Sequence, residues 1–105
     1  EGIVFLGLPE LDFSNPEVKG LIGEYSKRFG AAPAYSFLVA ATFDAVSALI
    51  DAFESVGSDG EKIRDYLYRY DKPGATGRVR FDSNGDIQGV TFALKRIVNG
   101  SPVVE

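Results

Sequence analysis

The chain has 105 residues, a formal net charge of −4 and a hydrophobic content of 45%. This length allows one domain at most, and the composition is typical of a folded chain and not of a disordered one. The acidic balance argues against a nucleic-acid partner, because phosphates require a basic face. No unbroken apolar run reaches the roughly 18 residues that mark a membrane-spanning helix, so we expect no such helix.

Two absences limit the chemistry that the chain can perform. It contains no cysteine and no histidine, so it has no disulfide, no thiolate metal ligand, and neither the strongest nucleophile nor the usual general base of enzymes. We therefore expect a protein without catalytic activity, cofactor or metal. The chain also has no methionine, even at position 1, which indicates that it was processed or cut from something longer.

The chain opens with a predicted strand, residues 1–8. Residues Ile3–Leu6 are apolar without alternation, which indicates a strand covered on both faces, as in a parallel-type sheet. A helix is predicted to follow, with Asn15 as its N-cap, Pro16 at its first position and Gly30 at its end.

The longest apolar segment, residues 35–57, is predicted to form a central helix. Its polar residues recur at steps of three and four and so share one narrow stripe: Asp44, Ser47, Asp51, Glu54 and Ser55. We expect this stripe to face solvent and the apolar remainder to be buried on more than one side. Asp44 and Asp51 lie two turns, or about 10 Å, apart and could in principle do acid–base work, but a solvated stripe is the favoured interpretation.

A third helix is predicted to begin at residues 58–61, whose Ser-x-x-Glu pattern is typical of a capping box. Residues 71–77 contain two glycines and a proline and are predicted to be a linker or hinge. From Arg78 onward the apolar residues alternate, which indicates a meander of strands. Its strands are predicted at 78–81, 87–98 and 103–104, and its turns at 83–86 and 99–100.

Residues 82–86, Asp-Ser-Asn-Gly-Asp, invite comparison with a calcium loop because oxygen-bearing side chains recur at alternate positions. The comparison with the EF-hand loop fails, because glycine is fourth instead of sixth and Ala93 stands where the bidentate glutamate belongs. A type I′-like Asn-Gly turn explains the same residues. Residues 74–77 are too short to cradle a phosphate and precede a strand instead of a helix, so a flexible joint is favoured there.

Four segments, taken in order, resemble a known family. They are EGIVF, a helix ending EYSKRFGAAP, the segment TFDAVSALIDAFESVGS, and the final GATGRVRFDSNGDIQGVTFALKRIVNG. The last resembles the family pattern Gly-x-x-Gly-x-x-x-Phe-Asp-x-Asn-Gly-Asp. Together they are similar to the C-terminal third of the type I periplasmic solute-binding proteins of branched-chain amino acid ABC transporters. Phe43 stands where the family more often has tyrosine.

The resemblance implies an α/β fold: a strand, three helices and then a β-meander, forming the C-terminal fragment of a two-lobed protein that traps a solute by hinge closure. Residues 1–8 would end the sheet of one lobe. Residues 9–82 would form the helices and a strand of the other lobe, and residues 83–105 would return to the first. The resemblance implies no catalytic residue and no cofactor.

The resemblance also implies partners and a location. The parent protein would bind leucine, isoleucine, valine or a related amino acid and deliver it to an ABC permease. It would be periplasmic or extracellular, and lipid-anchored in a Gram-positive source. Two residues are expected near the solute, with Ala40 as a wall for the solute side chain and Phe37 nearby. The ligand-binding ectodomain of a sensory receptor, which uses the same architecture, is the alternative.

The isolated chain is expected to behave differently from such a parent. Most polar contacts to the solute would come from earlier segments, so the chain alone should bind amino acids poorly. Its helices would also lack the sheet that covers them in the parent. We therefore expect it to self-associate, with a second copy of the central helix replacing that sheet.

Overall fold

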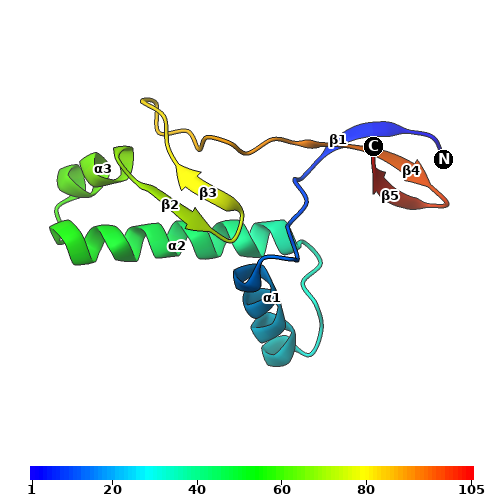
Figure 1. The fold of residues 1–105 in the computed structure, drawn as a ribbon, viewed down its shortest axis with the longest axis horizontal. Helices are drawn as coiled ribbons and strands as arrows, with labels where there is room; N and C mark the ends of the chain where they lie inside the picture. Colours follow the sequence, from blue (N-terminus) through cyan, green and yellow to red (C-terminus); the bar gives the residue numbers. More distant parts are fainter.

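A computed structural model describes the whole chain, residues 1–105, and shows two parts of different construction (Figure 1). One part is a three-stranded sheet near the two termini, and the other consists of three helices and a two-stranded hairpin. The elements are β1 (Val4–Gly7), α1 (Pro16–Phe29), α2 (Ser36–Val56), α3 (Gly60–Tyr68), β2 (Asp71–Gly74), β3 (Gly77–Arg80), β4 (Ala93–Val98) and β5 (Ser101–Val104). This order confirms the predicted α/β arrangement of one strand, three helices and further strands.

The three-stranded sheet joins the two ends of the chain. Its order is β1-β4-β5, and both pairings are antiparallel. The predicted parallel-type sheet, with its first strand covered on both faces, is therefore wrong for this chain, and Leu6 is 68% exposed. Asn99 and Gly100 both have positive φ, 52° and 77°, as the two-residue type I′ turn between β4 and β5 requires.

The strand predicted over 87–98 forms only in its second half. Ile87 makes a single bridge to Phe81, and regular pairing begins at Ala93. Gly89 has a φ of 79°, which interrupts an extended backbone because a regular strand requires negative φ. The segment between β3 and β4 is therefore a long connection between the two parts of the molecule (Figure 1).

Helix α1 begins and ends as its sequence predicts. The Asn15 side chain accepts a hydrogen bond of 3.0 Å from the backbone N–H of Glu17, and Pro16 occupies the first position. Gly30 ends the helix in the left-handed conformation, with a φ of 77°. These are local signals, because a cap requires only residues within one helical turn.

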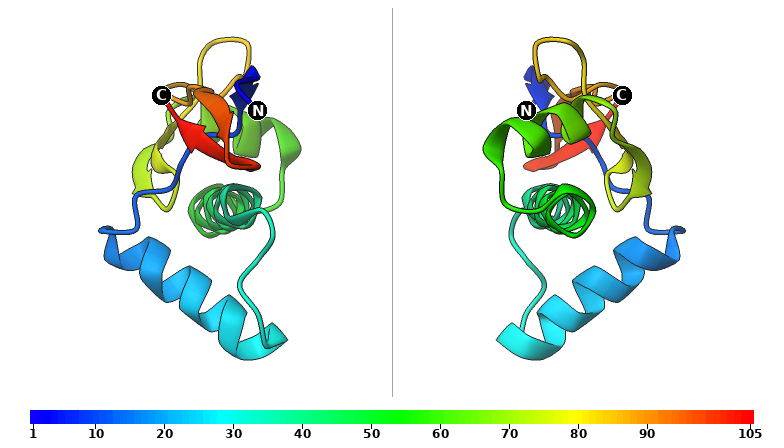
Figure 2. Two further views of the ribbon diagram at one scale, coloured as in Figure 1. Left: turned by 90° about the vertical axis from the view of Figure 1, so that its right-hand side faces the viewer. Right: turned by 90° about the vertical axis from the view of Figure 1, so that its left-hand side faces the viewer.

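Helix α2 is buried on the face where we expected solvent. Its buried residues follow a spacing of four: Ala40, Asp44, Ala48 and Ala52. This face lies against α3 and the hairpin β2–β3, as the view along α2 shows (Figure 2). The opposite face is apolar and about half exposed, including Val46, Leu49 and Phe53. The predicted solvent stripe is therefore wrong at Asp44, because the small alanines allow the hairpin to approach this face closely.

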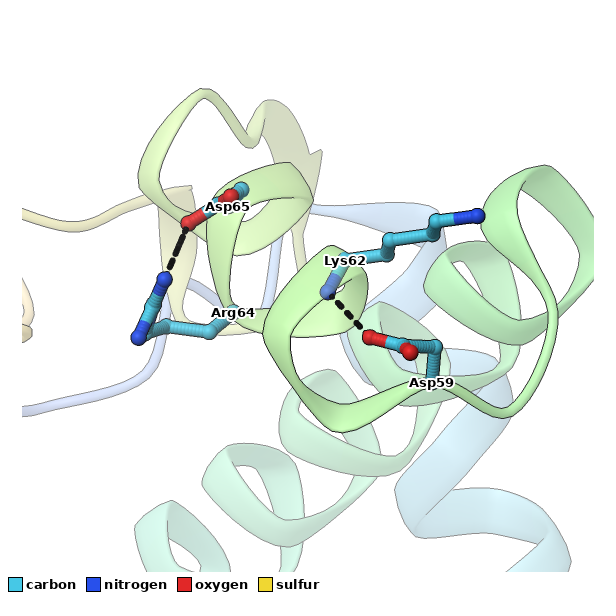
Figure 3. A network of polar contacts seen from close by, with 4 residues as sticks. All are labelled: Asp59, Lys62, Arg64 and Asp65. Carbon is cyan, nitrogen blue, oxygen red and sulfur yellow. Dashed lines mark hydrogen bonds and ion pairs between the residues drawn. The ribbon is translucent and has the colours of Figure 1, made fainter.

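Helix α3 is capped one residue later than predicted. The Asp59 side chain accepts a hydrogen bond of 3.0 Å from the backbone N–H of Lys62, so Asp59 is the N-cap (Figure 3). The predicted capping box, with Ser58 as the cap, is therefore wrong. On the exposed side of α3, Arg64 and Asp65 form an ion pair at 2.9 Å.

The segment predicted as a hinge is an ordered hairpin. Strand β2 pairs antiparallel with β3, with Gly74 opposite Gly77, so residues 75 and 76 form the tight turn. Strand β2 has no other neighbour, which is why Pro73 is tolerated there: an edge strand has a free side that needs no N–H donor.

Little of the chain is buried. Only eight residues are buried. Six of them form two small clusters, one of Val18, Ala40 and Ala75 and the other of Ala48, Tyr70 and Val79. Helix α2 has the length and composition of a membrane-spanning helix, although we expected none. The core helix of a soluble protein meets the same criterion, so this finding by itself is weak evidence for a membrane.

Candidate functional site

The buried carboxylate of Asp44 holds the turn of the hairpin against α2. Its Oδ1 accepts a hydrogen bond from the Ala75 N–H at 2.7 Å. Its Oδ2 accepts from the Thr76 N–H at 2.9 Å and from the Thr76 hydroxyl at 2.5 Å. Asp44 is only 6% exposed and forms no ion pair with any cation within 4 Å, so these three donors replace the water that a buried carboxylate loses.

Gly74 makes this close approach possible. A Cβ atom at Gly74 would lie 2.6 Å from Asp44 Oδ1 and 2.8 Å from Val79 Cγ2. Both distances are shorter than van der Waals contact, so a side chain here would push the turn away from Asp44. The glycine predicted to give a flexible joint therefore serves tight packing.

A second set of polar contacts holds the hairpin against α2, two turns further along the helix at Asp51. The Tyr70 hydroxyl donates to Asp51 Oδ2 at 2.7 Å, and Lys72 Nζ donates to the same oxygen at 3.0 Å. Lys72 Nζ also lies 5.4 Å from the centroid of the Tyr70 ring, within the range of a cation–π contact.

The contacts among Asp51, Tyr70 and Lys72 shift the pKa values of all three side chains. The hydrogen bond from Tyr70, and then that from Lys72, lower the pKa of Asp51 below its usual value. Burial, and then the bond to Asp51, raise the pKa of Tyr70 well above 10.0. The bond to Asp51 also raises the pKa of Lys72. Asp44 and Asp51 are therefore both engaged by their own chain, which favours a structural role over acid–base chemistry.

A hollow of about 250 Å³ lies where the two parts of the molecule meet. Its walls come from the loop after β1, the residues just before α2 and its first turn, and one residue of β4: Leu8, Pro9, Glu10, Leu11, Phe13, Ala34, Tyr35, Ser36, Phe37 and Lys95. Tyr35, the N-cap residue of α2, lies here, and its side chain makes no capping hydrogen bond. This hollow is our candidate functional site, because it combines an apolar wall with a few polar groups.

The polar groups of the hollow are an ion pair between its two sides. Lys95 pairs with Glu10, and the Lys95 side chain is only 15% exposed. Its stem crosses Gly7, where a Cβ atom would lie 2.9 Å from Lys95 Cδ. The pair links β4 to the loop that leads into the helical part, so it lies at one of the two connections between the parts (Figure 1).

The two expected site residues lie in different surroundings. Phe37 lines the candidate hollow and also a second, apolar hollow of about 170 Å³ between α2, β3 and the Ile87–Val90 segment. Ala40, one turn further along α2, is fully buried between Val18 and Ala75. Of the two residues, only Phe37 lines the candidate hollow of this chain.

The loop that invited comparison with a calcium site is closed on itself. The Asp82 carboxylate accepts from the backbone N–H groups of Asn84 and Asp86, at 2.8 and 3.0 Å. Gly85 has a positive φ of 87°, whereas Asn84 does not. The turn is therefore held by an aspartate side chain and is not the type I′ turn that we predicted, which needs positive φ at both central residues.

Sequence reasoning missed the Asp44 contact and the Lys95–Glu10 pair, because both join residues far apart in the chain. One signal for Asp44 was present: three alanines and this aspartate recur every fourth residue of α2. A stripe of small residues indicates a helix face that another segment approaches closely, so an aspartate within it is expected to be buried and bonded.

Comparison with known proteins gives one clear result. No family model and no curated protein matches the chain. Among solved structures, the leucine-binding protein LivK of Thermotoga maritima matches all of the chain with a TM-score of 0.74 and 32% identity. A protein of Rhodospirillum rubrum described as a branched-chain amino acid ABC transporter matches all of it with a TM-score of 0.65 and 27% identity.

A third structure supports the fold alone, since its sequence identity is 24%. It is the ABC transporter substrate-binding protein of Desulfitobacterium hafniense in complex with Leu, with a TM-score of 0.71 over the whole chain. The chain spans only 30–31% of the length of these three proteins, as a fragment of the two-lobed fold would. The resemblance is thus confirmed: throughout its length, the chain is similar to part of the substrate-binding proteins of ABC transporters for leucine and other branched-chain amino acids.

Proposed function

We propose that the chain is the C-terminal part of an extracytoplasmic solute-binding protein of an ABC importer, which captures a branched-chain or related amino acid by hinge closure. The observation that carries this proposal is the match to LivK of Thermotoga maritima, which covers the whole chain at 32% identity. The chain offers no histidine or cysteine, and its two closely bonded aspartates are engaged internally. Both facts favour binding over catalysis.

The two-part construction supports the hinge. Residues 1–8 and 83–105 would belong to one lobe, and residues 9–82 to the other. In Figure 1 the sheet and the helical part are joined by two extended connections, one before α1 and one between β3 and β4. Such connections can absorb the change in backbone angles when lobes close. The Lys95–Glu10 pair beside the first connection would limit how the lobes move.

The solute would lie at the candidate hollow, between the lobes. Phe37 would contact the apolar side chain of the solute, because it is the aromatic residue of the first turn of α2 in that hollow. Ala40 would support Phe37 from one helical turn further along α2. Its small, buried side chain allows Val18 and the hairpin turn to pack against the helix there, and this packing holds the start of α2 in place. The remaining polar contacts to the amino acid would come from the rest of the longer protein.

The location and partner follow from the same proposal. The protein would work outside the cytoplasm, in the periplasm or at the cell surface, and a lipid anchor would hold it in a Gram-positive source. The loaded protein would dock on an ABC permease. The isolated chain would bind amino acids poorly, and calorimetry that gave a micromolar affinity for leucine with this chain alone would contradict that expectation.

The proposal is tested by calorimetric titration of leucine, isoleucine and valine into the full-length protein that contains this chain. We expect saturable binding of at least one of them without turnover. Phe37→Ala should weaken binding roughly tenfold, because it removes apolar contact worth about 1.4 kcal/mol. Phe43→Ala is the matched control, since Phe43 lies outside both hollows and should leave affinity unchanged. Absence of binding, or saturable turnover of a substrate, would overturn the proposal.

A further inference from the structure

The side chain of Lys95 runs along the sheet part to reach the connection between β1 and α1. Lys95 lies on β4 opposite Phe5 of β1. Its stem passes Gly7, where an added Cβ atom would lie 2.9 Å from Lys95 Cδ and 3.1 Å from Lys95 Cε. The missing side chain at Gly7 therefore leaves room for this path. The ammonium group then pairs with Glu10, three residues beyond the end of β1.

Glu10 is thus tied to the sheet part, although it lies within the connection (Figure 1). The Lys95 side chain is only 15% exposed, so water screens this pair less than it screens a pair whose two members are exposed. Between β1 and Glu10, Pro9 fixes its own φ. The ion pair and the proline together make residues 8–10 a stiff extension of β1.

Leu11, the next residue, belongs to the helical part. It packs against the buried cluster that contains Val18. From Asp12 onward the backbone forms a turn that leads into α1, because the Asn15 N–H donates to the Asp12 carbonyl oxygen at 3.0 Å. A change of angle between the two parts must therefore be taken up where Glu10 meets Leu11, through the backbone angles on either side of their peptide bond.

We propose that this connection bends at the junction of Glu10 and Leu11, and that the Lys95–Glu10 pair keeps the bend there. Residues 1–10 then move with the sheet part, two residues more than the lobe boundary given above. The proposal rests on the hinge closure of the proposed function. By removing conformations of the open protein, the pair reduces the conformational entropy that is lost when the lobes close. Lys95 and Gly7 are thus positioning residues that act on affinity without contact with the solute.

The first test needs no ligand. It is the amide relaxation of the full-length protein that contains this chain, measured by nuclear magnetic resonance. In the wild type the amides of Leu8 and Glu10 should be rigid, with order parameters of about 0.85. Lys95→Met keeps the stem and removes the charge, so both values should fall toward about 0.6, whereas that of Asn15 should not change. Gly7→Ala displaces the lysine stem and should lower the same two values.

Arg96→Met is the matched control for this test. Arg96 follows Lys95 on β4 and also forms an ion pair, but its partner Glu105 lies in the sheet part. Its loss should leave the amides of Leu8 and Glu10 rigid. If Arg96→Met loosened these amides as much as Lys95→Met, or if Lys95→Met left them rigid, the proposal would be wrong.

The second test is the affinity of the full-length protein for leucine, measured by calorimetry. Lys95→Met and Glu10→Gln should each weaken binding roughly two- to fivefold, and the double variant no more than either alone. Exchanging the two residues, as Glu10→Lys with Lys95→Glu, should restore affinity because it rebuilds the pair. A lysine that contacted the solute directly would not be rescued in this way, so an exchange that binds as weakly as the single variants would overturn the proposal.

The two tests separate this proposal from the proposed function. If the wild type binds none of leucine, isoleucine and valine, the proposed function fails, while the relaxation data still locate the bend. If the wild type binds leucine but the amides of Leu8 and Glu10 are mobile even with the pair intact, the proposed function stands and the bend does not lie at Glu10.

Discussion

The helical part and the sheet part of this molecule are stabilised in different ways. In the helical part, side chains from distant segments join the elements: Asp44 holds the hairpin turn, and Asp51 holds Tyr70 and Lys72. In the sheet part, backbone pairing joins the strands, and the ion pair between side chains of the sheet, Arg96 with Glu105, is partly exposed. The comparison teaches that the helical part depends on a few residues, whereas the sheet part depends on its turns.

The largest effect is expected from Asp44→Ala in the helical part. The substitution leaves three donors of the turn without a partner, and two of them are backbone N–H groups that no side-chain rotation can turn toward water. We expect a loss of about 2–4 kcal/mol of stability, measured by urea unfolding. Hydrogen exchange at the Ala75 and Thr76 amides should accelerate strongly. If those amides stay protected in the variant, Asp44 does not hold the turn.

A smaller loss is expected from Gly74→Ala. Its methyl group would lie 2.6 Å from Asp44 Oδ1, so the turn must shift, at a cost of about 1–3 kcal/mol. Gly20→Ala is the control, because nothing lies within 4 Å of the added Cβ and the site is inside α1. It should stabilise the chain by about 0.5–1 kcal/mol. Equal effects of the two substitutions in urea unfolding would contradict the close packing at Gly74.

The network around Asp51 predicts a dependence of stability on pH. The pKa of Tyr70 and that of Lys72 are raised in the folded chain, so their contribution is complete below the unfolded values near pH 10 and is lost as the pH rises through the folded values. The pKa of Asp51 is lowered, so its contribution is lost as the pH falls below about 4. Urea midpoints should therefore fall at both extremes, and Tyr70→Phe should flatten the alkaline limb.

The sheet part should respond to its turn and only weakly to its surface. Asn99 has a φ of 52°, and Asn99→Ala places a less suitable residue there, at a cost of about 1 kcal/mol. Asn99→Gly, which accepts this φ freely, is the control and should preserve the hairpin. Loss of the amide signals of β5 in nuclear magnetic resonance spectra of Asn99→Ala, but not of Asn99→Gly, would confirm that the turn determines the pairing.

The smallest effect is expected at the exposed ion pair on α3. Arg64 and Asp65 are both more than half exposed, so their attraction is screened by water and salt. Arg64→Ala should change stability by no more than about 0.5 kcal/mol. If Arg64→Ala lowered the urea midpoint as much as Asp44→Ala does, the exposed ion pair would stabilise the chain as much as the buried carboxylate. That result would contradict the expected difference between the two sites.

The sequence predicted what neighbouring residues determine. Asn15, Pro16 and Gly30 placed α1 correctly, because a cap is formed within one helical turn. The order of the elements and the resemblance to the solute-binding proteins were also predicted from the sequence. The strand at 78–81 was predicted, but its pairing with residues 71–74 was not. The glycines and proline of residues 71–77 are as typical of a loop as of an edge strand.

Of the residues that line the candidate hollow, the sequence analysis named only Phe37, and its contact with a solute stays a prediction. Phe37 lines the hollow, but Lys95 and Glu10 meet there through contacts between the two ends of the chain. The burial of Asp44 depends on a turn 31 residues later, and no local pattern reports such a pairing. Long-range contacts of this kind are determined by the assembled fold, so a residue's own neighbours in sequence cannot reveal them.

The pairing of β1 with β4 has a consequence for how the chain folds. Gly7 lies opposite Ala93, so nearly the whole chain must already be arranged before these two strands can meet. Closing so long a loop costs chain entropy that only non-local contacts repay. The helices and the hairpin, whose contacts are closer in sequence, should therefore form first. The three-stranded sheet should form last and, on gentle destabilisation, open first.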